Sequence, residues 1–317
     1  MPDISIRRFC GTGASAILFA GVTGGAALAV LLAFASIIAV LMHGAWPALA
    51  AFGPGFFTSQ AWNPVTGQFG ALAPMHGTLV TSLIAMLIAA PVAIGITIFL
   101  TELCPARLRS PLRAAIELLA GVPSIVFGFW GLFVLAPFLQ TAIQPEIIAA
   151  FSNVPLLSNL FAGPPYGIGV LTAGLVLAIM ILPIMTAILC DVFTAVPAVL
   201  KEAAYGIGAT TWEVVRHVVL PHARGGMIGA GILGLGRALG ETMAVTFVIG
   251  NAHRISGSLL APGTTISAAI ANEFSEATGT LYTASLVALG LLLFVITFAV
   301  LATARFFLSQ PSPKARP

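Results

Sequence analysis

Charged side chains are scarce in this sequence of 317 residues. Only 7% of the residues are Asp, Glu, Lys or Arg, whereas a soluble globular chain carries about 25%. Residues 9–101 contain none of the four types. So few charges cannot cover a surface that faces water, which excludes an ordinary soluble globular protein. The 59% of hydrophobic residues indicates instead that much of the chain lies in lipid.

Residues that hold metals or form disulfides are also few and scattered. The three cysteines, Cys10, Cys104 and Cys190, lie far apart and match neither a CxxC metal site nor a paired framework. We interpret them as apolar fillers. The histidines have no ligand-like spacing and fall near predicted membrane edges or in loops; they are His43, His76, His217, His222 and His253. The sequence therefore predicts neither a metal site nor a catalytic set.

Six long apolar windows are present, each long enough to cross a bilayer as a helix. The first window exceeds the roughly 7–15 apolar residues of a secretory signal, so it is interpreted as a retained span. Pro and Gly residues lie inside some spans, and Gly121, Pro123 and Gly128 are expected to bend the third. The windows are 17–42, 78–100, 114–139, 167–190, 225–250 and 281–307.

Lysine and arginine predict how these spans are oriented. With the amino terminus inside, eleven of the thirteen basic residues fall in inner segments, Arg254 falls in an outer segment and Arg237 within a span. This distribution follows the positive-inside rule and predicts that both termini are cytoplasmic. The inner residues are Arg7, Arg8, Arg107, Arg109, Arg113, Lys201, Arg216, Arg224, Arg305, Lys314 and Arg316.

The first outer segment, residues 43–77, is rich in aromatic rings, among them Trp46, Trp62, Phe56 and Phe69. Amphipathic rings gather where a membrane meets water, so lipid-interface anchoring is the preferred interpretation. A platform for a ligand is the alternative.

Arg237 and Glu241 lie deep in the fifth span, four residues apart. A charge at the centre of a bilayer costs at least about 2.5–3.5 kcal/mol, so such residues face the bundle interior or water and mark a pathway. Helical spacing puts Leu233, Gly234, Arg237, Glu241 and Ala244 on one stripe. The rival interpretation is that the two charges neutralise one another, although Arg before Glu is the poorer order for an intrahelical pair. A similar pair, Arg113 with Glu117, is expected at the inner end of the third span.

The longest inner loop, residues 191–224, has a regular pattern. Its first helix begins near Lys201 and weakens at Gly206 and Gly208. A second helix is expected with Thr211 as its N-cap and Glu213 in its first turn. Its valines form one face, and it is expected to stop at Pro221. Two short helices with a glycine break would form a cytoplasmic knob suited to docking in a partner's groove.

This loop resembles the EAA loop of ABC-importer permeases. The pattern is E-A-A, three residues, G, nine residues, an aliphatic, one residue and L-P, with Val218 at the aliphatic position where Ile is usual. The resemblance implies that the loop couples the permease to an ATP-hydrolysing subunit. The residues that carry this implied role are Lys201, Glu202, Ala203, Ala204, Gly208, Leu220 and Pro221.

The resemblance extends over essentially the whole chain. FGALAPMHGTLVTSLIAMLIAAPVAIGITIFLTEL (69–103), GVPSIVFGFWGLFVLAP (121–137) and GRALGETMAVTFVIGN (236–251) are similar to the phosphate permeases of bacterial uptake systems, more to the PstC-type than to the PstA-type subunit. It implies an all-α integral membrane protein with the type I ABC importer permease fold, in the bacterial inner membrane. Partners implied are a PstA-like second permease, two PstB-like ATP-binding subunits and a PstS-like extracytoplasmic phosphate-binding protein.

The chain has no phosphate-binding loop of its own, because its two lysines, Lys201 and Lys314, do not follow the GxxxxG pattern. ATP with Mg²⁺ is therefore expected on the partner ATPase, with no cofactor or metal in this chain, which is a transport subunit and no enzyme. Arg suits a phosphate because its planar fork donates several hydrogen bonds to the anion's oxygens. Arg237 and Glu241 are therefore candidates for the substrate pathway.

The implied organisation has five parts. A cytoplasmic tail occupies 1–14, a first span 15–42, an extracytoplasmic interfacial segment 43–77, a five-helix permease core with its coupling loop 78–307, and a second cytoplasmic tail 308–317. Three alternatives stay open. They are a PstA-type paralogue, a permease for another oxyanion such as sulfate or molybdate, and a secondary transporter or channel working alone. An intramembrane enzyme would need paired carboxylates, a Ser/His pair or clustered ligands within the bilayer.

Overall fold

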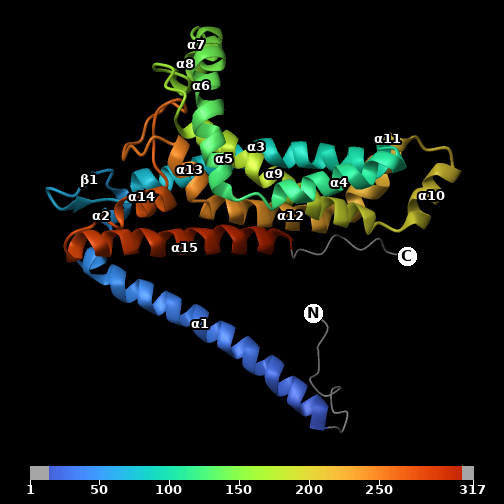
Figure 1. Ribbon diagram of the computed structural model, residues 1–317, viewed down its shortest axis with the longest axis horizontal. Helices are drawn as coiled ribbons and strands as arrows, with labels where there is room; N and C mark the ends of the chain where they lie inside the picture. The colour runs from blue at the N-terminus through green and yellow to red at the C-terminus, as the bar shows by residue number, and fades with distance from the viewer. Residues whose placement is uncertain (1–13, 309–317) are drawn as a thin grey trace.

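The computed structural model describes residues 14–308, which are mostly helical (Figure 1). Elements labelled η are π-helical turns, in which the helix is locally widened. The elements are α1 (Ala14–Phe52), α2 (Gly55–Thr58), β1 (Trp62–Asn63), β2 (Gln68–Phe69), α3 (Leu72–Ile98), η2 (Phe99–Leu103), α4 (Ala106–Ala120), α5 (Ser124–Trp130), η3 (Gly131–Leu135), α6 (Ala136–Phe138), η4 (Leu139–Ile143), α7 (Gln144–Phe151), α8 (Pro155–Leu160), α9 (Val170–Thr194), α10 (Ala198–Gly206), α11 (Thr211–Val214), η5 (Val215–Val219), α12 (Leu220–Gly240), α13 (Met243–Val248), α14 (Ile266–Glu273) and α15 (Thr280–Leu308).

Six helical stretches among the described residues are long and apolar enough to cross a membrane, which confirms the predicted number of spans. The predicted tails, 1–14 and 308–317, lie almost wholly outside the described residues. The stretches are Leu18–Phe52, Leu72–Leu103, Ser124–Phe151, Val170–Thr194, Thr211–Gly240 and Thr280–Phe306.

The fourth span, α9, is the central helix. In α9, 67% of the most apolar window is buried, whereas the corresponding share is 28% or less in each of the other five spans. Helix α3 packs along α9 and contributes Ala85, Ala89 and Ala93, all fully buried, to the same core cluster as Leu177. Small residues four apart let two helix backbones approach closely, as membrane helices require. Most of α9 is therefore covered by other parts of the protein.

The third span begins later than the sequence predicts. Helix α4 is a separate amphipathic helix, none of whose residues is buried. It ends at Ala120 with Gly121 as its C-cap, and Pro123 has an extended conformation with ψ 138° before the span starts at Ser124. The predicted limits, 114–139, were wrong because Pro123 has no N–H for a continuing helix and begins a new one instead. The expected bend is thus a complete break, after which α5, α6 and α7 leave the layer of α3, α9 and α12 at a steep angle (Figure 1).

The segment after the first span is folded. Helix α1 extends to Phe52 and α3 starts at Leu72, and between them lie α2 and a two-stranded hairpin in which Trp62 pairs with Phe69. Phe56 and Phe69 are buried and Trp62 is half-buried, so lipid anchoring was a wrong interpretation for these three rings. They pack in a second core cluster with the ends of α1, α14 and α15. Trp46, 68% exposed, remains compatible with lipid contact.

The N-terminal end of α3 meets the segment before α14 without a side chain between them. A Cβ added at Gly77 would collide with the Thr264 carbonyl group, so only glycine permits this approach. One residue on, Thr78 Oγ1 accepts a hydrogen bond from Ile266 N at 2.9 Å. The hairpin, α2 and α14 together define what we call the hairpin end of the molecule. The opposite end, which carries α10 and α11, is called the loop end (Figure 1).

Candidate functional site

The fifth span is interrupted beside its two charged residues. Helix α12 ends at Gly240, Glu241 is extended (φ −70°, ψ 132°), and a new helix, α13, begins at Met243. The predicted continuous helix over 225–250, and with it the common stripe of Arg237 and Glu241, was therefore wrong. Glycines at 234, 236 and 240 lower helix propensity here. The break is held from outside, because Ser267 Oγ donates a 2.6 Å hydrogen bond to the Glu241 carbonyl oxygen.

Arg237 lies in the last turn of α12 and is exposed. Within residues 14–308 no ion pair includes it, so the two charges do not neutralise one another in this structure. A cation in the last turn of a helix is stabilised by the partial negative charge of the free carbonyl groups. The neighbouring exposed residue on α12 is Leu233, 60% accessible. The guanidinium is therefore available to a ligand.

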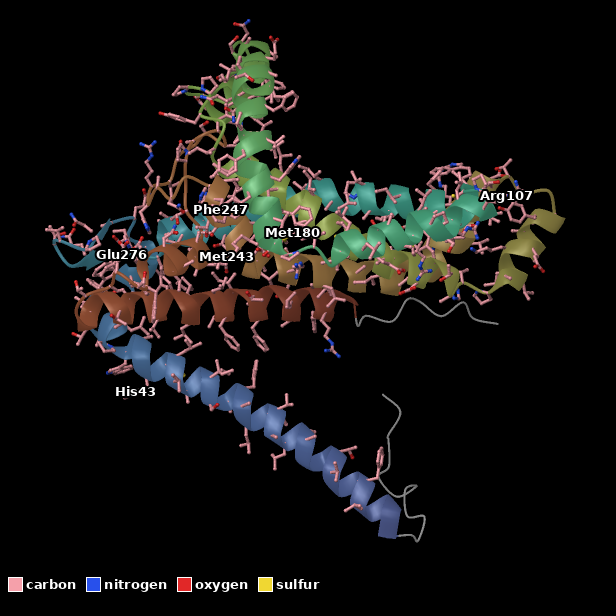
Figure 2. The ribbon with its side chains drawn as sticks, in the orientation of Figure 1. His43, Arg107, Met180, Met243, Phe247 and Glu276 are labelled. Carbon is pink, nitrogen blue, oxygen red and sulfur yellow. The ribbon has the colours of Figure 1, made fainter. Side chains whose placement is uncertain are left out.

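Glu241 occupies a different environment. It is only 9% exposed, and its Oε1 accepts a hydrogen bond from Ala244 N at 3.3 Å, which satisfies a free N–H group in the first turn of α13. Figure 2 shows Met243 and Phe247 of this helix beside α5, where the rings of Phe129 and Phe247 lie 4.6 Å apart. The Glu241 side chain therefore holds the first turn of α13 beside the break.

The loop at the loop end is built around a helix C-cap. Gly208 has φ +89°, Gly208 N donates to Tyr205 O at 2.9 Å, and Ala209 N donates to Ala204 O at 3.1 Å. This pair of bonds is a Schellman motif, in which the residue after the cap needs the left-handed conformation that glycine adopts readily. The part of the loop pattern from Ala204 to Gly208 therefore corresponds to the C-terminal cap of a helix.

The second helix of the loop differs from the prediction at both ends. Its N-cap is Thr210 rather than Thr211, with a reciprocal capping box to Glu213. It does not stop at Pro221, because the π-helical turn η5 leads directly into α12 and Pro221 lies in the first turn of that helix. The valine face is confirmed, since Val214, Val215 and Val219 are buried.

Lys201 faces the molecule's own interior rather than a partner. Its Nζ lies 2.6 Å from Glu102 Oε1 in η2, and both side chains are largely covered. Glu202, Ala203, Gly208 and Pro221 are exposed, whereas Ala204 and Leu220 are half-buried. A hollow of about 430 Å³ lies beside Gly208, lined among others by Ala204, Ile207, His217 and Val218. Ile207 is 88% exposed at its rim.

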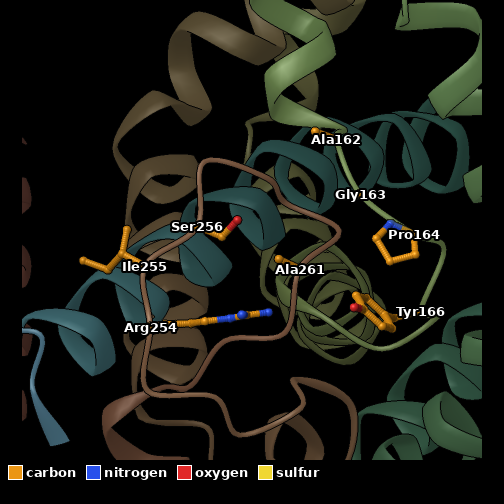
Figure 3. A pocket seen from close by; sticks show the side chains of 8 residues that line it. All are labelled: Ala162, Gly163, Pro164, Tyr166, Arg254, Ile255, Ser256 and Ala261. Atoms are coloured by element: carbon orange, nitrogen blue, oxygen red, sulfur yellow. The ribbon is translucent and has the colours of Figure 1, made fainter.

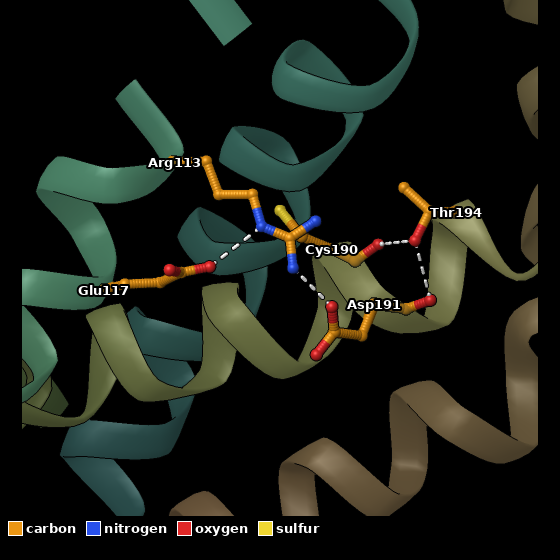
Figure 4. Close-up of polar contacts among 5 residues, drawn as sticks. All are labelled: Arg113, Glu117, Cys190, Asp191 and Thr194. Carbon is orange, nitrogen blue, oxygen red and sulfur yellow. Dashed lines mark hydrogen bonds and ion pairs between the residues drawn. The ribbon is translucent and has the colours of Figure 1, made fainter. Parts of the chain in front are cut away.

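A second ion network joins α4 to α9 at the loop end. Arg113 lies between Glu117, at 2.9 Å, and Asp191, at 2.5 Å (Figure 4). Hydrogen bonds to Glu117 and then to Asp191 raise the pKa of Arg113 above its ordinary value. The expected pair with Glu117 is present, and Asp191 is a partner that sequence spacing does not reveal.

Four side chains from distant parts of the sequence meet at the hairpin end. Glu273 accepts hydrogen bonds from Trp62 Nε1 and Tyr282 OH, each at 2.6 Å, and its other oxygen lies 2.6 Å from His253 Nε2. The imidazole stacks on the Trp62 ring with 4.8 Å between centroids. Burial alone would raise the pKa of Glu273, but hydrogen bonds from His253, Tyr282 and Trp62 outweigh it and lower that pKa. We call these four residues the Glu273 cluster.

The Glu273 cluster was missed because its members are up to 220 positions apart, from Trp62 to Tyr282, and no local spacing brings them together. Among residues 14–308 no three His, Cys, Asp or Glu side chains form a group that could hold a metal ion. The side chains in Figure 2 include Arg107 at the loop end and Glu276 at the hairpin end.

Comparison with known protein families gives one match. The family model described as "Binding-protein-dependent transport system inner membrane component" matches residues 93–308. The match includes the break beside Arg237 and the whole of the loop end.

Individual relatives are similar along nearly their whole length. The chain is 63% identical to the phosphate transport system permease protein PstC of Mesorhizobium japonicum, over 97% of this chain and 93% of that protein. It is 41% identical to the phosphate transport system permease protein PstC 2 of Mycobacterium tuberculosis, over 91% and 90%.

Solved structures share the fold at low identity. A bacterial ABC transporter involved in the import of the acidic polysaccharide alginate matches with a TM-score of 0.61 and 13% identity, over 93% of this chain and 96% of that one. The inward-facing MetNI methionine ABC transporter matches with a TM-score of 0.50 and 20% identity, over 77% and 96%. At these identities the likeness shows the fold alone.

Proposed function

Because the chain belongs to the family of binding-protein-dependent transport system inner membrane components, we propose that it is the PstC-type permease subunit of an ATP-driven importer of inorganic phosphate. It is a multi-pass inner-membrane protein with the ABC importer permease fold, and it is a transport component rather than an enzyme. The observation that supports phosphate as the substrate is the 63% identity to a protein named as a phosphate permease.

In this proposal Arg237 contacts phosphate as it crosses the membrane. The guanidinium is exposed on the fifth span, and no ion pair among the described residues neutralises it. An unneutralised charge at this depth is costly unless it faces water or a ligand. Glu241 acts beside it, and its carboxylate accepts a hydrogen bond from a protonated phosphate oxygen or moderates the positive charge of Arg237. Sulfate carries no proton at neutral pH, so the first role favours phosphate.

The loop end is cytoplasmic in this proposal and receives motion from the ATPase subunits. The hollow beside Gly208 and the exposed Ile207 and Trp212 offer an apolar docking surface. Because η5 and α12 are one continuous helix, a displacement at the loop reaches Arg237 without crossing a hinge. Alternating access would then follow from movement of this helix against α9.

The partners are a PstA-like permease, two PstB-like ATPases that bind ATP with Mg²⁺, and a PstS-like phosphate-binding protein outside. The hairpin end and residues 53–71 are accordingly extracytoplasmic, and both termini are cytoplasmic. A PstA-type role or another oxyanion is less well supported, because the relatives named above are PstC phosphate permeases. A transporter working alone leaves the loop pattern without a purpose.

The decisive experiment compares Arg237→Gln and Arg237→Lys in the reconstituted complex. We expect Arg237→Gln to lower phosphate uptake about tenfold or more, since a hydrogen bond to a charged group contributes about 1.5–3 kcal/mol and 1.4 kcal/mol is a factor of ten. Arg305→Gln, at an exposed arginine in the last turn of α15, is the matched control. Sulfate and molybdate are tested in parallel as stimulants of ATP hydrolysis. Normal uptake by an Arg237→Gln complex that still assembles would refute the contact.

A further inference from the structure

Arg254 lies at the edge of two hollows at the hairpin end. The larger has a volume of about 270 Å³ and is bounded by the chain before α9 and by the loop between α13 and α14 (Figure 3). The second, of about 10 Å³, shares Arg254, Ser256 and Ala261 with the first and continues towards His76 and Gly77 of α3. Arg254 therefore borders both hollows.

The guanidinium of Arg254 extends across the larger hollow towards Tyr166, whose hydroxyl points back to it (Figure 3). Ser256 adds a second hydroxyl to the same wall. None of the ion pairs formed within residues 14–308 includes Arg254. A guanidinium fork with hydroxyl donors beside it and no carboxylate partner suits a compact oxyanion.

The loop that carries Arg254 is anchored on both sides. His253 is held by Glu273, Ala252 N donates to Gly263 O at 2.9 Å, and Leu259 N donates to Leu160 O at 2.8 Å. Within the loop, Ser258 N donates to Ser256 Oγ at 3.1 Å. Binding is more favourable where the donors are already in place, because less ordering remains to be done.

We propose that Arg254, with the hydroxyls of Tyr166 and Ser256, forms an oxyanion-binding site at the hairpin end that takes phosphate before it reaches Arg237. This inference rests on the proposed function, because it assumes that phosphate is the cargo and that the hairpin end is extracytoplasmic. Carboxylates of a docked binding protein share the same chemistry, and the experiment below separates the two sources.

The test places a cysteine in the hollow without altering its polar groups. Ala162 is exposed and lines the hollow, so Ala162→Cys in the reconstituted complex is treated with an anionic thiosulfonate reagent. Phosphate at ten times its dissociation constant is expected to slow the modification about tenfold, since occupied sites then outnumber free sites about ten to one. Chloride at equal ionic strength controls for screening. Thr278→Cys, exposed between α14 and α15, is the control reporter and is expected to be unaffected.

The second variant is Arg254→Gln in the Ala162→Cys background. It is expected to abolish the protection by phosphate. Protection that persists in this variant, or no protection in its parent, overturns the inference. Protection by the unloaded binding protein but not by phosphate also overturns it, because the partner would then be a carboxylate. If Ala162→Cys fails to react, Pro164→Cys reports on the same hollow.

ATP-driven phosphate uptake by the complex without substitutions separates this inference from the proposed function. If that complex takes up no phosphate, the proposed function is contradicted. If it transports phosphate but phosphate does not protect Ala162→Cys, only the site at Arg254 is contradicted.

Discussion

Arg237 and Glu241 are four residues apart, yet each is stabilised at the end of a different helix. The arginine lies among the free carbonyl groups of the last turn of α12, and the glutamate bonds an N–H group in the first turn of α13. Opposite charges placed at opposite helix ends are each stabilised by the backbone. Helical spacing alone predicts a shared stripe and cannot reveal this arrangement, since it assumes that the helix continues.

Also at the residue scale, Glu273→Gln is expected to destabilise the hairpin end. The amide cannot accept the hydrogen bonds of Trp62, Tyr282 and His253 on two charged oxygens, and a hydrogen bond to a charged group contributes about 1.5–3 kcal/mol. Thermal unfolding in detergent at neutral pH measures the loss. Glu276→Gln, at an exposed carboxylate three positions on, is the control and should leave the midpoint unchanged.

The same residue predicts a dependence on pH. The pKa of Glu273 is lower in the folded protein than the ordinary value of about 4.3, so its contribution is fully present above that value and is lost as the pH falls through the folded pKa. The unfolding midpoint of the parent should therefore drop more steeply below about pH 4.3 than that of Glu273→Gln. Parallel curves for the two proteins would contradict this assignment.

At the scale of elements, Gly208 offers a test of the loop. Its φ of +89° is unfavourable for any residue with a Cβ, by about 1–2 kcal/mol, although an added Cβ meets no described atom within 4 Å. Gly208→Ala should therefore move the Schellman turn and lower the coupling of ATP hydrolysis to phosphate uptake severalfold. Gly206→Ala is the matched control, because Gly206 is helical and has equally open space. If the ratio of phosphate uptake to ATP hydrolysis is equal in the two variants, the Schellman turn does not contribute to coupling with the ATPase.

Elements were predicted well where the signal is local and poorly where a helix is interrupted. Apolar length predicted the number of spans, although not the limits of the third and the fifth, and the valine face was correct because helical periodicity acts over a few residues. The breaks at Pro123 and Gly240 were missed or underestimated. Proline and glycine are tolerated inside membrane helices when neighbours satisfy the backbone, so their presence does not distinguish a bend from an end. At Gly240 the deciding contact is Ser267, which is distant in the sequence.

At the scale of the whole molecule, burial is uneven. Helix α9 is mostly buried, while α12 leaves Leu233 60% exposed beside Arg237. If a second permease covers this face, a membrane-permeant maleimide should label Leu233→Cys in the isolated subunit and several times more slowly in the complete complex. Leu28→Cys, 57% exposed on α1, is the control on a different helix. Equal labelling of Leu233→Cys in both states would place the partner on another face.

Long-range organisation was the part least accessible from the sequence. The aromatic residues of the hairpin were assigned to lipid because their composition matches an interface, yet Phe56 and Phe69 are buried against helices from both ends of the chain. Lys201 was grouped with the coupling residues because it directly precedes the E-A-A pattern, yet its charge is met by Glu102. In both cases the deciding neighbour lies far away along the chain.

The contact of Gly77 with Thr264 limits which parts of the molecule can move separately. Backbone lies on backbone there, and Ile266 N is held by Thr78, so the first turns of α3 and the start of α14 shift only as one rigid unit. Rearrangements on the microsecond-to-millisecond scale must then be absorbed elsewhere, at extended residues such as Pro123 and Glu241. The amide hydrogen of Ile266 should accordingly exchange with solvent among the slowest at the hairpin end, and those around the two breaks much faster.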